Sequence, residues 1–381
     1  MRETRVKERL KHELRLLYAT KEQSQNGKRN TGLDMARGVA IILITAGHSS
    51  SVGGVPAVWL STFHLPAFFL LSGWLMAMRQ ETEGSIKTVL GRKMKSIMIP
   101  YFWFSFASLL LDCVQLLRGK FTGETVWQHF LETISLQGYS VMWFLPVLLL
   151  AELGVFAGYK IMARMKCSAQ ISYPVAALFW TVVACAAYYL YQAIAGTAIP
   201  VFWLGEIRIM VKAVLGAAFM AYGAGFFRLF GAREYKITGK TGLGAVGILC
   251  IAVNVVAAFS VQHMDLNNLN VGFLPHYLLL GTCGSLGLVF VCKLLPNIAP
   301  LTFFGQNSLI IMSTHLNFYV MYVAMRLTDV IAGGCNRTVW TILMLFMTFL
   351  LEIPVILLIR MFFPFVLGRA RAHRAVAEKG K

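Results

Sequence analysis

The chain has 381 residues, of which 57% are hydrophobic and only 14% are charged, and its mean hydropathy is +0.65. These values exceed what a water-soluble protein of this size carries, so they exclude an ordinary soluble globular protein. The formal net charge of +18 would suggest nucleic acid in a soluble protein, but here the basic residues gather in alternate loops, which predicts membrane topology and contact with anionic lipids and argues against nucleic-acid binding.

The first 32 residues form a polar, basic segment ahead of the apolar stretches. This segment has no apolar core, so a cleavable signal is not expected. Val6, Leu10, Leu14 and Leu17 fall on one helical face among basic residues, which is typical of a helix lying on the inner leaflet, although a solvated, partly disordered tail fits equally well. Residues 1–32 are therefore predicted to be a basic cytoplasmic tail.

Apolar stretches long enough to cross a bilayer recur after this tail. A helix needs about 20 apolar residues to span a hydrocarbon core of roughly 30 Å, and about ten such stretches are predicted. They cover residues 34–52, 58–78, 96–117, 139–159, 171–194, 207–228, 242–260, 272–292, 303–326 and 338–363. The stretch 125–136 is too short and polar to cross, and we expect it at the membrane interface. The chain is thus predicted to be an all-α, polytopic integral membrane protein.

The distribution of Lys and Arg predicts the orientation of these spans. Loops rich in basic residues alternate with loops that have few, and the rich loops are expected on the cytoplasmic side. The basic N-terminal tail belongs to the rich side, so both termini are predicted to be cytoplasmic. No stretch outside the spans is long enough for a second folded domain. Residues 33–366 are predicted to form one membrane domain, and residues 367–381 a basic cytoplasmic tail.

Four histidines lie in or beside the predicted spans. Eleven residues of helix place His48 about 16 Å beyond Arg37, in the outer half of the membrane. His64 lies about two turns from the outer end of the second span, His276 begins the eighth span, and His315 lies near the middle of the ninth. Each alone is explained as a packing residue that donates a hydrogen bond, but together they predict convergence. Histidine moves protons near neutral pH, which suits a transferase and also a proton-coupled transporter.

Two glutamates lie within predicted spans, where an unpaired charge is costly. Glu152 is in the fourth span and Glu352 in the tenth. We expect both to hold helices together by pairing with Lys212, Arg326 or a backbone group, rather than to take part in catalysis.

Other charged residues lie at the two ends of the spans. Glu206 and Arg208 begin the sixth span at its outer end, where they are expected either to contact a polar acceptor or to be solvated flanking charges. At the cytoplasmic end, Arg92, Lys93 and Lys95 precede Pro100-Tyr101. This cluster is suited to holding the phosphates of a soluble donor, although ordinary topogenic charges would have the same pattern.

The remaining chemistry-bearing residues give no specific signal. The seven cysteines are scattered without a CxxC spacing, so neither a metal site nor a disulfide framework is predicted. The sequence Ser72-Gly73 interrupts an apolar helix, which indicates close helix packing or a local bend.

Several segments, in order along the chain, resemble the acyltransferase-3 family of membrane proteins that O-acylate surface sugars. The most specific is Leu33-Asp34-Met35-Ala36-Arg37-Gly38-Val39-Ala40 followed by His48, because the family has an arginine and a histidine separated by ten residues in its first helix. The others are Phe63-His64-Leu65-Pro66-Ala67-Phe68-Phe69, Arg92 through Pro100-Tyr101, Trp143-Phe144-Leu145, and Gly305-Gln306-Asn307-Ser308-Leu309 leading to His315.

This resemblance implies that acetyl-CoA is the usual donor, offered from the cytosol of a bacterial inner or plasma membrane. The acceptor would be a hydroxyl of a polysaccharide or lipid-linked sugar, acylated toward the outer side. By motif, His48 is the catalytic histidine and Arg37 its companion in donor handling, while Arg92 holds CoA phosphates and Lys95 stands where many members have arginine. His64 matches a recurrent position and is a candidate donor to the developing oxyanion.

These inferences together give one set of predicted site residues and no metal. The catalytic residues are His48 and His64, the donor-binding residues Arg37, Arg92, Lys93 and Lys95, and the substrate-binding residues Glu206, Arg208, His276 and His315. Asp265 and Asn267 through Asn270 are further outer residues suited to sugar recognition.

Two other functions fit parts of the sequence. Many helices with intramembrane charges also suit a transporter or flippase of a lipid-linked sugar or small metabolite, although no internal repeat is visible. A membrane sensor that works with a separate partner protein is the third possibility. Dependence on CoA separates the enzyme from the transporter, because a transporter would neither bind nor consume acetyl-CoA.

Overall fold

The computed structural model describes residues 30–49, 51–81, 84–231 and 239–368, together with residues 8, 10 and 11. Within these ranges every regular element is a helix, and the strand-like pairing is limited to a single bridge between Asp265 and Asn270. The predicted all-α class is confirmed. Most of the predicted N-terminal tail and residues 369–381 of the predicted C-terminal tail lie outside the described residues.

The helices follow one another with mostly short connections. In chain order they are α2 (Thr31–Gly47), α3 (Gly54–Met78), α4 (Ile86–Lys93), the π-helical segment η3 (Met94–Met98), α5 (Ile99–Leu117), α6 (Gly123–Ile134), the 3-10 turn η4 (Ser140–Trp143), α7 (Phe144–Arg164), α8 (Ala169–Ile194), α9 (Val201–Phe226), the π-helical segment η5 (Phe227–Gly231), α10 (Gly239–Ala257), α11 (Leu274–Leu294), α12 (Ala299–Gln306), α13 (Ser308–Thr314), α14 (Val320–Ala332), α15 (Arg337–Phe362) and the 3-10 turn η6 (Pro364–Leu367).

Within the described part of the chain, 7 helical stretches are long and apolar enough to cross a membrane. They are Gly54–Met78, Ile86–Leu117, Ser140–Arg164, Gln170–Ile194, Val201–Phe230, Leu274–Leu294 and Arg337–Phe362. Each coincides with a predicted span, as expected for a multi-pass membrane protein. The first and seventh predicted spans are shorter helices, α2 with 17 residues and the apolar part of α10, Thr241–Ala257.

The ninth predicted span, 303–326, was expected to be one helix, and this is wrong. The chain breaks at Asn307, between α12 and α13, and again after His315, where Tyr319 has a φ of 58°. Asn307 donates from its amide to the Phe303 carbonyl (2.8 Å) and accepts from Arg360 (3.1 Å). Such contacts from neighbouring helices allow a membrane helix to break. The break leaves His315 at the end of a short helix.

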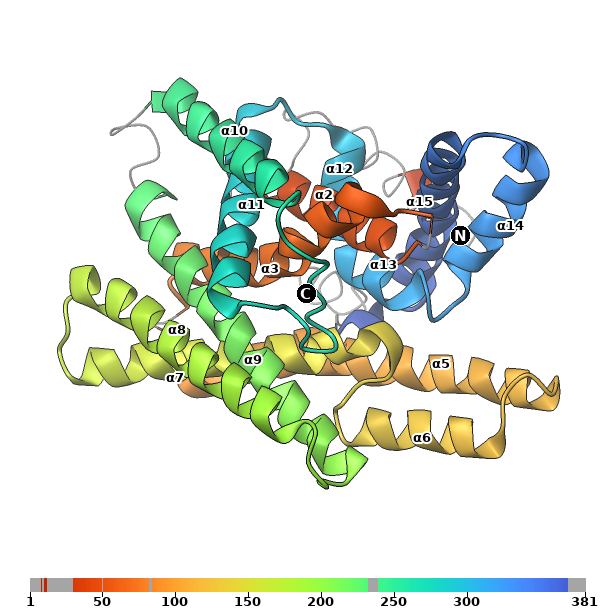
Figure 1. The fold of residues 1–381 in the computed structure, drawn as a ribbon, viewed down its shortest axis with the longest axis horizontal. Coiled ribbons are helices and arrows are strands. Elements are labelled where there is room, and N and C mark those ends of the chain that lie inside the picture. Colours follow the sequence, from red (N-terminus) through yellow and green to blue (C-terminus); the bar gives the residue numbers. More distant parts are fainter. Residues whose placement is uncertain are drawn as a thin grey trace, which may run out of the picture.

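Helix α2 lies in the middle of the molecule, where it packs against α3, α11 and α12 (Figure 1). Helices α7, α8 and α9 pack together on one side, and α14 pairs with α15 on the other. Helices α5 and α6 extend side by side away from the body as an arm (Figure 1). The central position of α2 brings both of its ends into contact with other helices.

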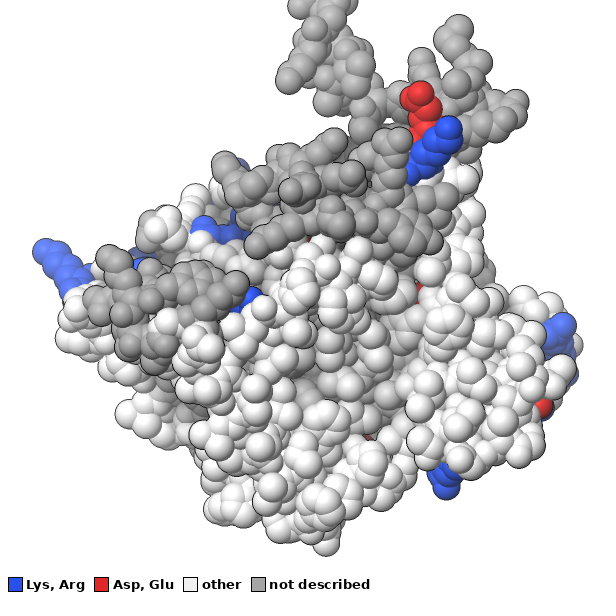
Figure 2. All heavy atoms as spheres, turned by 90° about the horizontal axis from the view of Figure 1, so that it is seen from above, with Lys and Arg blue, Asp and Glu red and all other residues white. Residues whose placement is uncertain are grey.

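The surface contains broad apolar areas. Figure 2 shows a face on which uncharged atoms dominate, with the visible Lys and Arg side chains near its edges. Along α8, Leu178, Val182 and Leu190 are exposed by 67%, 59% and 64%. A continuous apolar surface of this kind would be unfavourable in water, and it is suited to contact with lipid.

Glycines allow several of these helices to touch backbone to backbone. A Cβ atom added to Gly305 would lie 1.8 Å from the carbonyl oxygen of Asp34, and one on Gly38 would lie 2.0 Å from a carbonyl oxygen of α12. In the crossing of α3 with α9, a Cβ on Gly73 would lie 1.9 Å from the Met220 oxygen. Small residues at helix interfaces allow this approach. The close packing predicted at Ser72-Gly73 is therefore observed.

We expect Gly305→Ala to destabilise the protein, because the added methyl group has no space unless α2 and α12 separate. Overpacking of this kind costs about 1–3 kcal/mol. The matched control is Gly225→Ala on α9, where an added Cβ meets no atom within 4 Å. Thermal unfolding in nanodiscs should show a lower midpoint for Gly305→Ala alone. Equal midpoints for the two variants would contradict the observed contact between α2 and α12.

Candidate functional site

Two histidines from distant parts of the chain meet at the C-terminal ends of α2 and α13. His48 directly follows α2, and His315 directly follows α13. The Nδ1 atom of His48 lies 2.9 Å from the Nε2 atom of His315, which is a hydrogen-bond distance. His315 is fully buried, whereas His48 is exposed. The pair therefore has one inner member and one member that a ligand can reach.

The partners of the two rings determine where the protons lie. The His315 Nδ1 atom is 2.7 Å from the carbonyl oxygen of Ile311, and a carbonyl only accepts, so Nδ1 donates. In a neutral His315 the Nε2 atom is then an acceptor, so the His48 Nδ1–H donates to it. The remaining His48 nitrogen, Nε2, keeps its lone pair. This arrangement orients His48 as a proton acceptor.

His48 lines a cavity of about 340 Å³ that we call the histidine cavity. Its walls come from α2, α3, the segment before α7, the loop between α10 and α11, and the end of α13. The polar lining residues are His48, Ser61, His64, Ser140, His263, Asp265 and Asn267, and the aromatic ones include Trp143 and Phe144. A cavity with many hydrogen-bonding groups and aromatic walls is suited to a polar organic substrate.

His64 also reaches the histidine cavity, as predicted. Its Nδ1 atom donates to the carbonyl oxygen of Leu60 on the preceding turn of α3. A neutral His64 therefore presents a lone pair at Nε2, and a Cβ added to Gly47 would lie 3.9 Å from that atom. The predicted role as donor to an oxyanion does not fit this tautomer, because it needs a hydrogen on Nε2.

His276 does not line the histidine cavity. It lines a separate cavity of about 230 Å³ together with His263, and its ring packs at 5.0 Å from that of Phe273. Of the four histidines that were expected to converge, the structure therefore brings together His48, His64 and His315. His276 lies at the N-terminal end of α11 and is exposed.

A second and larger cavity, of about 640 Å³, lies beside the basic segment of α4 and η3. We call it the cationic cavity. Its polar lining residues are Lys87, Thr88, Arg92, Lys95, Ser96, Gln306 and Asn307. Arg92 and Lys95 are where the donor phosphates were predicted to bind. Lys93 is not a lining residue, since its ammonium group contacts Glu81 and Glu152.

Both cavities are lined by residues of α13, and each lies next to a different end of α2. Gln306 lines the cationic cavity and donates to Asp34 at the start of α2 (3.3 Å), whereas His48 follows the end of that helix. The helical rise puts about 21 Å between Asp34 and His48. On α13, Ile310 lines the cationic cavity and Met312 lines the histidine cavity. Residues of α13 that lie two positions apart thus line the two cavities.

Arg37 lies on α2, between Asp34 and His48 in the sequence. It is half-buried, one turn beyond Asp34 and eleven residues before His48. Its place on the central helix fits the predicted companion role in donor handling, but the cationic cavity is lined by other residues.

Glu206 and Arg208 of α9 were predicted to bind the sugar acceptor, but both form hydrogen bonds with other residues of the protein. Glu206 accepts a hydrogen bond from the Gln137 amide (2.9 Å), and Arg208 donates from Nε to the Tyr191 hydroxyl (3.1 Å). Neither residue lines the histidine cavity. Nearby on α6, burial raises the pKa of Glu132, although neighbouring cationic groups oppose this shift. Glu206 and Arg208 thus connect α9 to the surrounding elements.

Lys212 lies one turn further along α9 and was not predicted to belong to the site. Its ammonium group donates to the Oδ1 atom of Asn267 (2.8 Å) and lies 4.2 Å from the centre of the Trp143 ring. Lys212 is only 3% exposed, while both of its partners line the histidine cavity. A buried lysine within a span is costly, which makes this arrangement a candidate functional feature.

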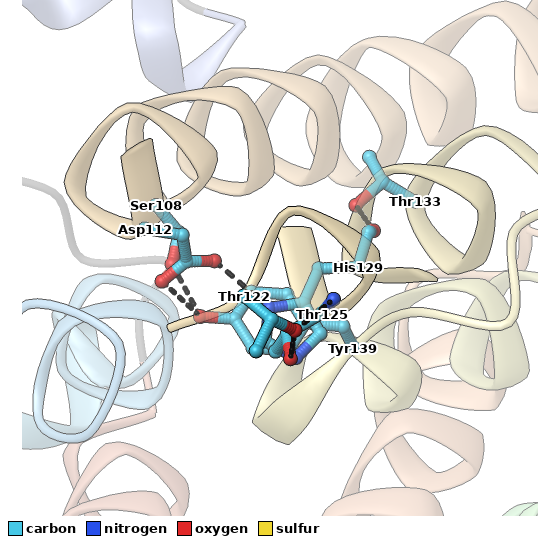
Figure 3. A network of polar contacts seen from close by, with 7 residues as sticks. All are labelled: Ser108, Asp112, Thr122, Thr125, His129, Thr133 and Tyr139. Carbon is cyan, nitrogen blue, oxygen red and sulfur yellow. Dashed lines mark hydrogen bonds and ion pairs between the residues drawn. The ribbon is translucent and has the colours of Figure 1, made fainter. Parts of the chain in front are cut away.

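A polar network joins α5, α6 and the segment before α7 beside this cavity (Figure 3). Asp112 contacts His129 Nδ1 (3.0 Å) with one oxygen and accepts from the Tyr139 hydroxyl (3.3 Å) with the other. The His129 and Tyr139 rings stack at 3.9 Å, and Ser108 lies 3.0 Å from the Tyr139 hydroxyl. The next residue, Ser140, lines the histidine cavity. This network was not predicted, although an aspartate within an apolar span is a signal for it.

The carboxylates within the spans have other partners than predicted. Glu152 pairs with Lys93 at 2.9 Å, and Glu352 accepts from the Thr314 hydroxyl at 3.0 and 2.9 Å. Neither glutamate pairs with Lys212, whose ammonium group contacts Asn267, or with Arg326. Thr314 immediately precedes His315, so Glu352 attaches the histidine-bearing segment to α15.

Comparison with known proteins agrees with the motifs. The family model described as an acyltransferase domain, that of acyltransferase family 3, matches residues 30–366. No curated protein and no solved structure matches the chain. The matched residues contain every helix from α2 to α15, all of the histidine cavity, and all of the cationic cavity except Leu367 and Gly368.

Proposed function

Because the chain belongs to the acyltransferase-3 family, we propose that it transfers an acyl group from acyl-CoA, most simply acetyl-CoA, to a sugar hydroxyl. The acceptor is a polysaccharide or lipid-linked sugar of the cell envelope, and the membrane is a bacterial inner or plasma membrane. The observation that carries the proposal is that a cationic cavity and a histidine cavity share α13 as a wall and lie near opposite ends of α2.

The cationic cavity is the donor entrance in this proposal. Arg92, Lys95 and Lys87 line it and supply the positive charge that the phosphates of CoA need. The cavity belongs to the side of the chain rich in basic loops, so it faces the cytosol. The pantetheine arm then extends beside α2 and brings the thioester to His48, about 16 Å beyond Arg37.

His48 acts as the general base. Its Nε2 atom takes the proton of the acceptor hydroxyl while the hydroxyl oxygen forms a bond to the thioester carbonyl carbon. The carbon–sulfur bond breaks, and the sulfur of CoA leaves with the proton that His48 had taken. His315 accepts from the opposite nitrogen and so stabilises the charged imidazole between the two proton transfers. A two-step route, in which His48 carries the acyl group, uses the same nitrogen.

Asn267 is the proposed donor to the oxyanion and to the acceptor. An ammonium group only donates, so Lys212 fixes the Asn267 oxygen toward itself and leaves the two amide hydrogens for other partners. Asn267 lines the histidine cavity, as does Asp265, whose carboxylate suits a sugar hydroxyl. Asn267 thus takes the role of donor to the oxyanion, for which His64 was the candidate from the sequence.

The donor assignment predicts that Arg92→Ala binds CoA about 10- to 100-fold more weakly, since a hydrogen bond to a charged group contributes about 1.5–3 kcal/mol. Isothermal titration of CoA into the protein in nanodiscs measures this. Lys160→Ala, a basic residue of α7 outside both cavities, is the control and should bind as the unsubstituted protein does. Absence of CoA binding in the unsubstituted protein would contradict the proposed function and favour the transporter.

A further inference from the structure

Lys93 lies on a different face of its helix from the residues that line the cationic cavity. Thr88, Arg92 and Lys95 follow a helical spacing of three to four residues and line that cavity. Val89 and Ile97 precede and follow Lys93 by four residues, and they are only 3% and 5% exposed. Positions four apart share a helix face. Lys93 therefore belongs to the inner face, which packs against the protein.

Two buried carboxylates hold Lys93 on that face. Its Nζ atom lies 3.1 Å from Glu81 Oε2 and 2.9 Å from Glu152 Oε2. The side chains of Glu81 and Glu152 are 2% and 8% exposed, and that of Lys93 is 12% exposed. Glu152 belongs to α7, so this contact attaches the basic helix to the helix bundle. The geometry leaves Lys93 facing away from any ligand in the cationic cavity.

Glu81 also contacts a residue that does line the cavity. Its Oε1 atom lies 3.1 Å from a terminal nitrogen of Arg92. One carboxylate thus contacts the inward lysine and the cavity-lining arginine at the same time. The Arg92 side chain is 51% exposed, so its position would vary widely without such a partner.

We propose that Glu81, Lys93 and Glu152 form a positioning clamp for donor binding. The clamp fixes the rotation of α4 and η3 against α7, and this rotation directs Arg92 and Lys95 into the cationic cavity. The three residues contact no ligand in this proposal and act through Arg92 and Lys95. The inference rests on the proposed function, because it assumes that the cationic cavity binds the phosphates of CoA.

The test measures binding of CoA and of 3′-dephospho-CoA to the protein in nanodiscs. CoA carries the additional phosphate, so correctly positioned cations bind it more tightly than the dephospho form. Lys93→Met and Glu152→Gln should each weaken CoA binding about tenfold, the scale of one charged hydrogen bond, and should reduce the preference for CoA. Lys93→Arg, which keeps the charge and can reach both carboxylates, should stay within about twofold of the unsubstituted protein.

The double variant Lys93→Met/Glu152→Gln separates the clamp from independent effects. If the two residues act together, the CoA affinity of the double variant equals that of the single variant with the lower affinity. Arg79→Gln is the matched control, because Arg79 contacts Glu81 at 3.8 Å but its side chain is 57% exposed. Glu152→Gln still tests the clamp if Lys93→Met does not fold.

Two outcomes would overturn the clamp while leaving the proposed function intact. One is normal CoA affinity in Lys93→Met and Glu152→Gln when Arg92→Ala binds weakly. The other is an equal loss of affinity for CoA and 3′-dephospho-CoA, which indicates a general structural defect. If the unsubstituted protein does not bind CoA, or Arg92→Ala binds it normally, the proposed donor site itself fails.

Discussion

His48→Ala is expected to lower the rate of acyl transfer by about a thousandfold, because general base catalysis contributes about 10²- to 10⁴-fold. His315 Nδ1 donates to Ile311, so His315 Nε2 accepts the hydrogen on His48 Nδ1. The lone pair of His48 Nε2 is therefore available to take the proton of the acceptor hydroxyl. The measurement is release of CoA from labelled acetyl-CoA in nanodiscs, with membranes from cells that lack this chain as the source of acceptor.

His276→Ala is the matched control for this experiment. His276 is an exposed histidine that lines a different cavity, so its removal should leave the rate within about twofold of the unsubstituted value, as for a surface substitution. Both variants should bind CoA normally, because neither lines the cationic cavity. Normal turnover by well-folded His48→Ala would exclude the proposed mechanism.

His315→Phe is expected to lower the rate about a hundredfold, the scale on which misplacement of a catalytic group acts. Phenylalanine fills the buried space but accepts no hydrogen bond, so His48 loses the partner that orients its ring and its proton. CoA binding should not change. The single-turnover rate at saturating acetyl-CoA measures the effect.

His315→Gln should recover part of that loss, because its amide oxygen can accept from the His48 Nδ1–H. A merely structural role for His315 would instead make the two variants alike in rate and in thermal stability. A higher rate for His315→Phe than for His315→Gln would contradict the orienting role.

The helical composition of the fold was predictable because long apolar stretches have one stable form in a bilayer. The seven stretches that are long and apolar enough to cross all coincide with predicted spans. The break at Asn307 was not predictable, because its polar groups are satisfied by Arg360 from α15, more than fifty residues away. Hydropathy averages over such a break and gives one continuous span.

The candidate site was predictable where it depends on one helix. The spacing of Arg37 and His48 follows from the rise of α2. Convergence of His315 toward His48 was predicted, but direct contact between the two rings was not, since the segment of His315 was assigned to an unbroken helix. The contacts of Lys93 were not predictable, because a run of basic residues does not reveal which of them meets a buried carboxylate.

The most direct test of the account is a structure of the protein in nanodiscs with acetyl-CoA bound. We predict phosphate groups in contact with Arg92 and Lys95, a pantetheine arm beside α2 and α13, and the acetyl group in the histidine cavity next to His48 Nε2. Binding of acetyl-CoA with its thioester outside that cavity would contradict the proposal that the two cavities form one active site.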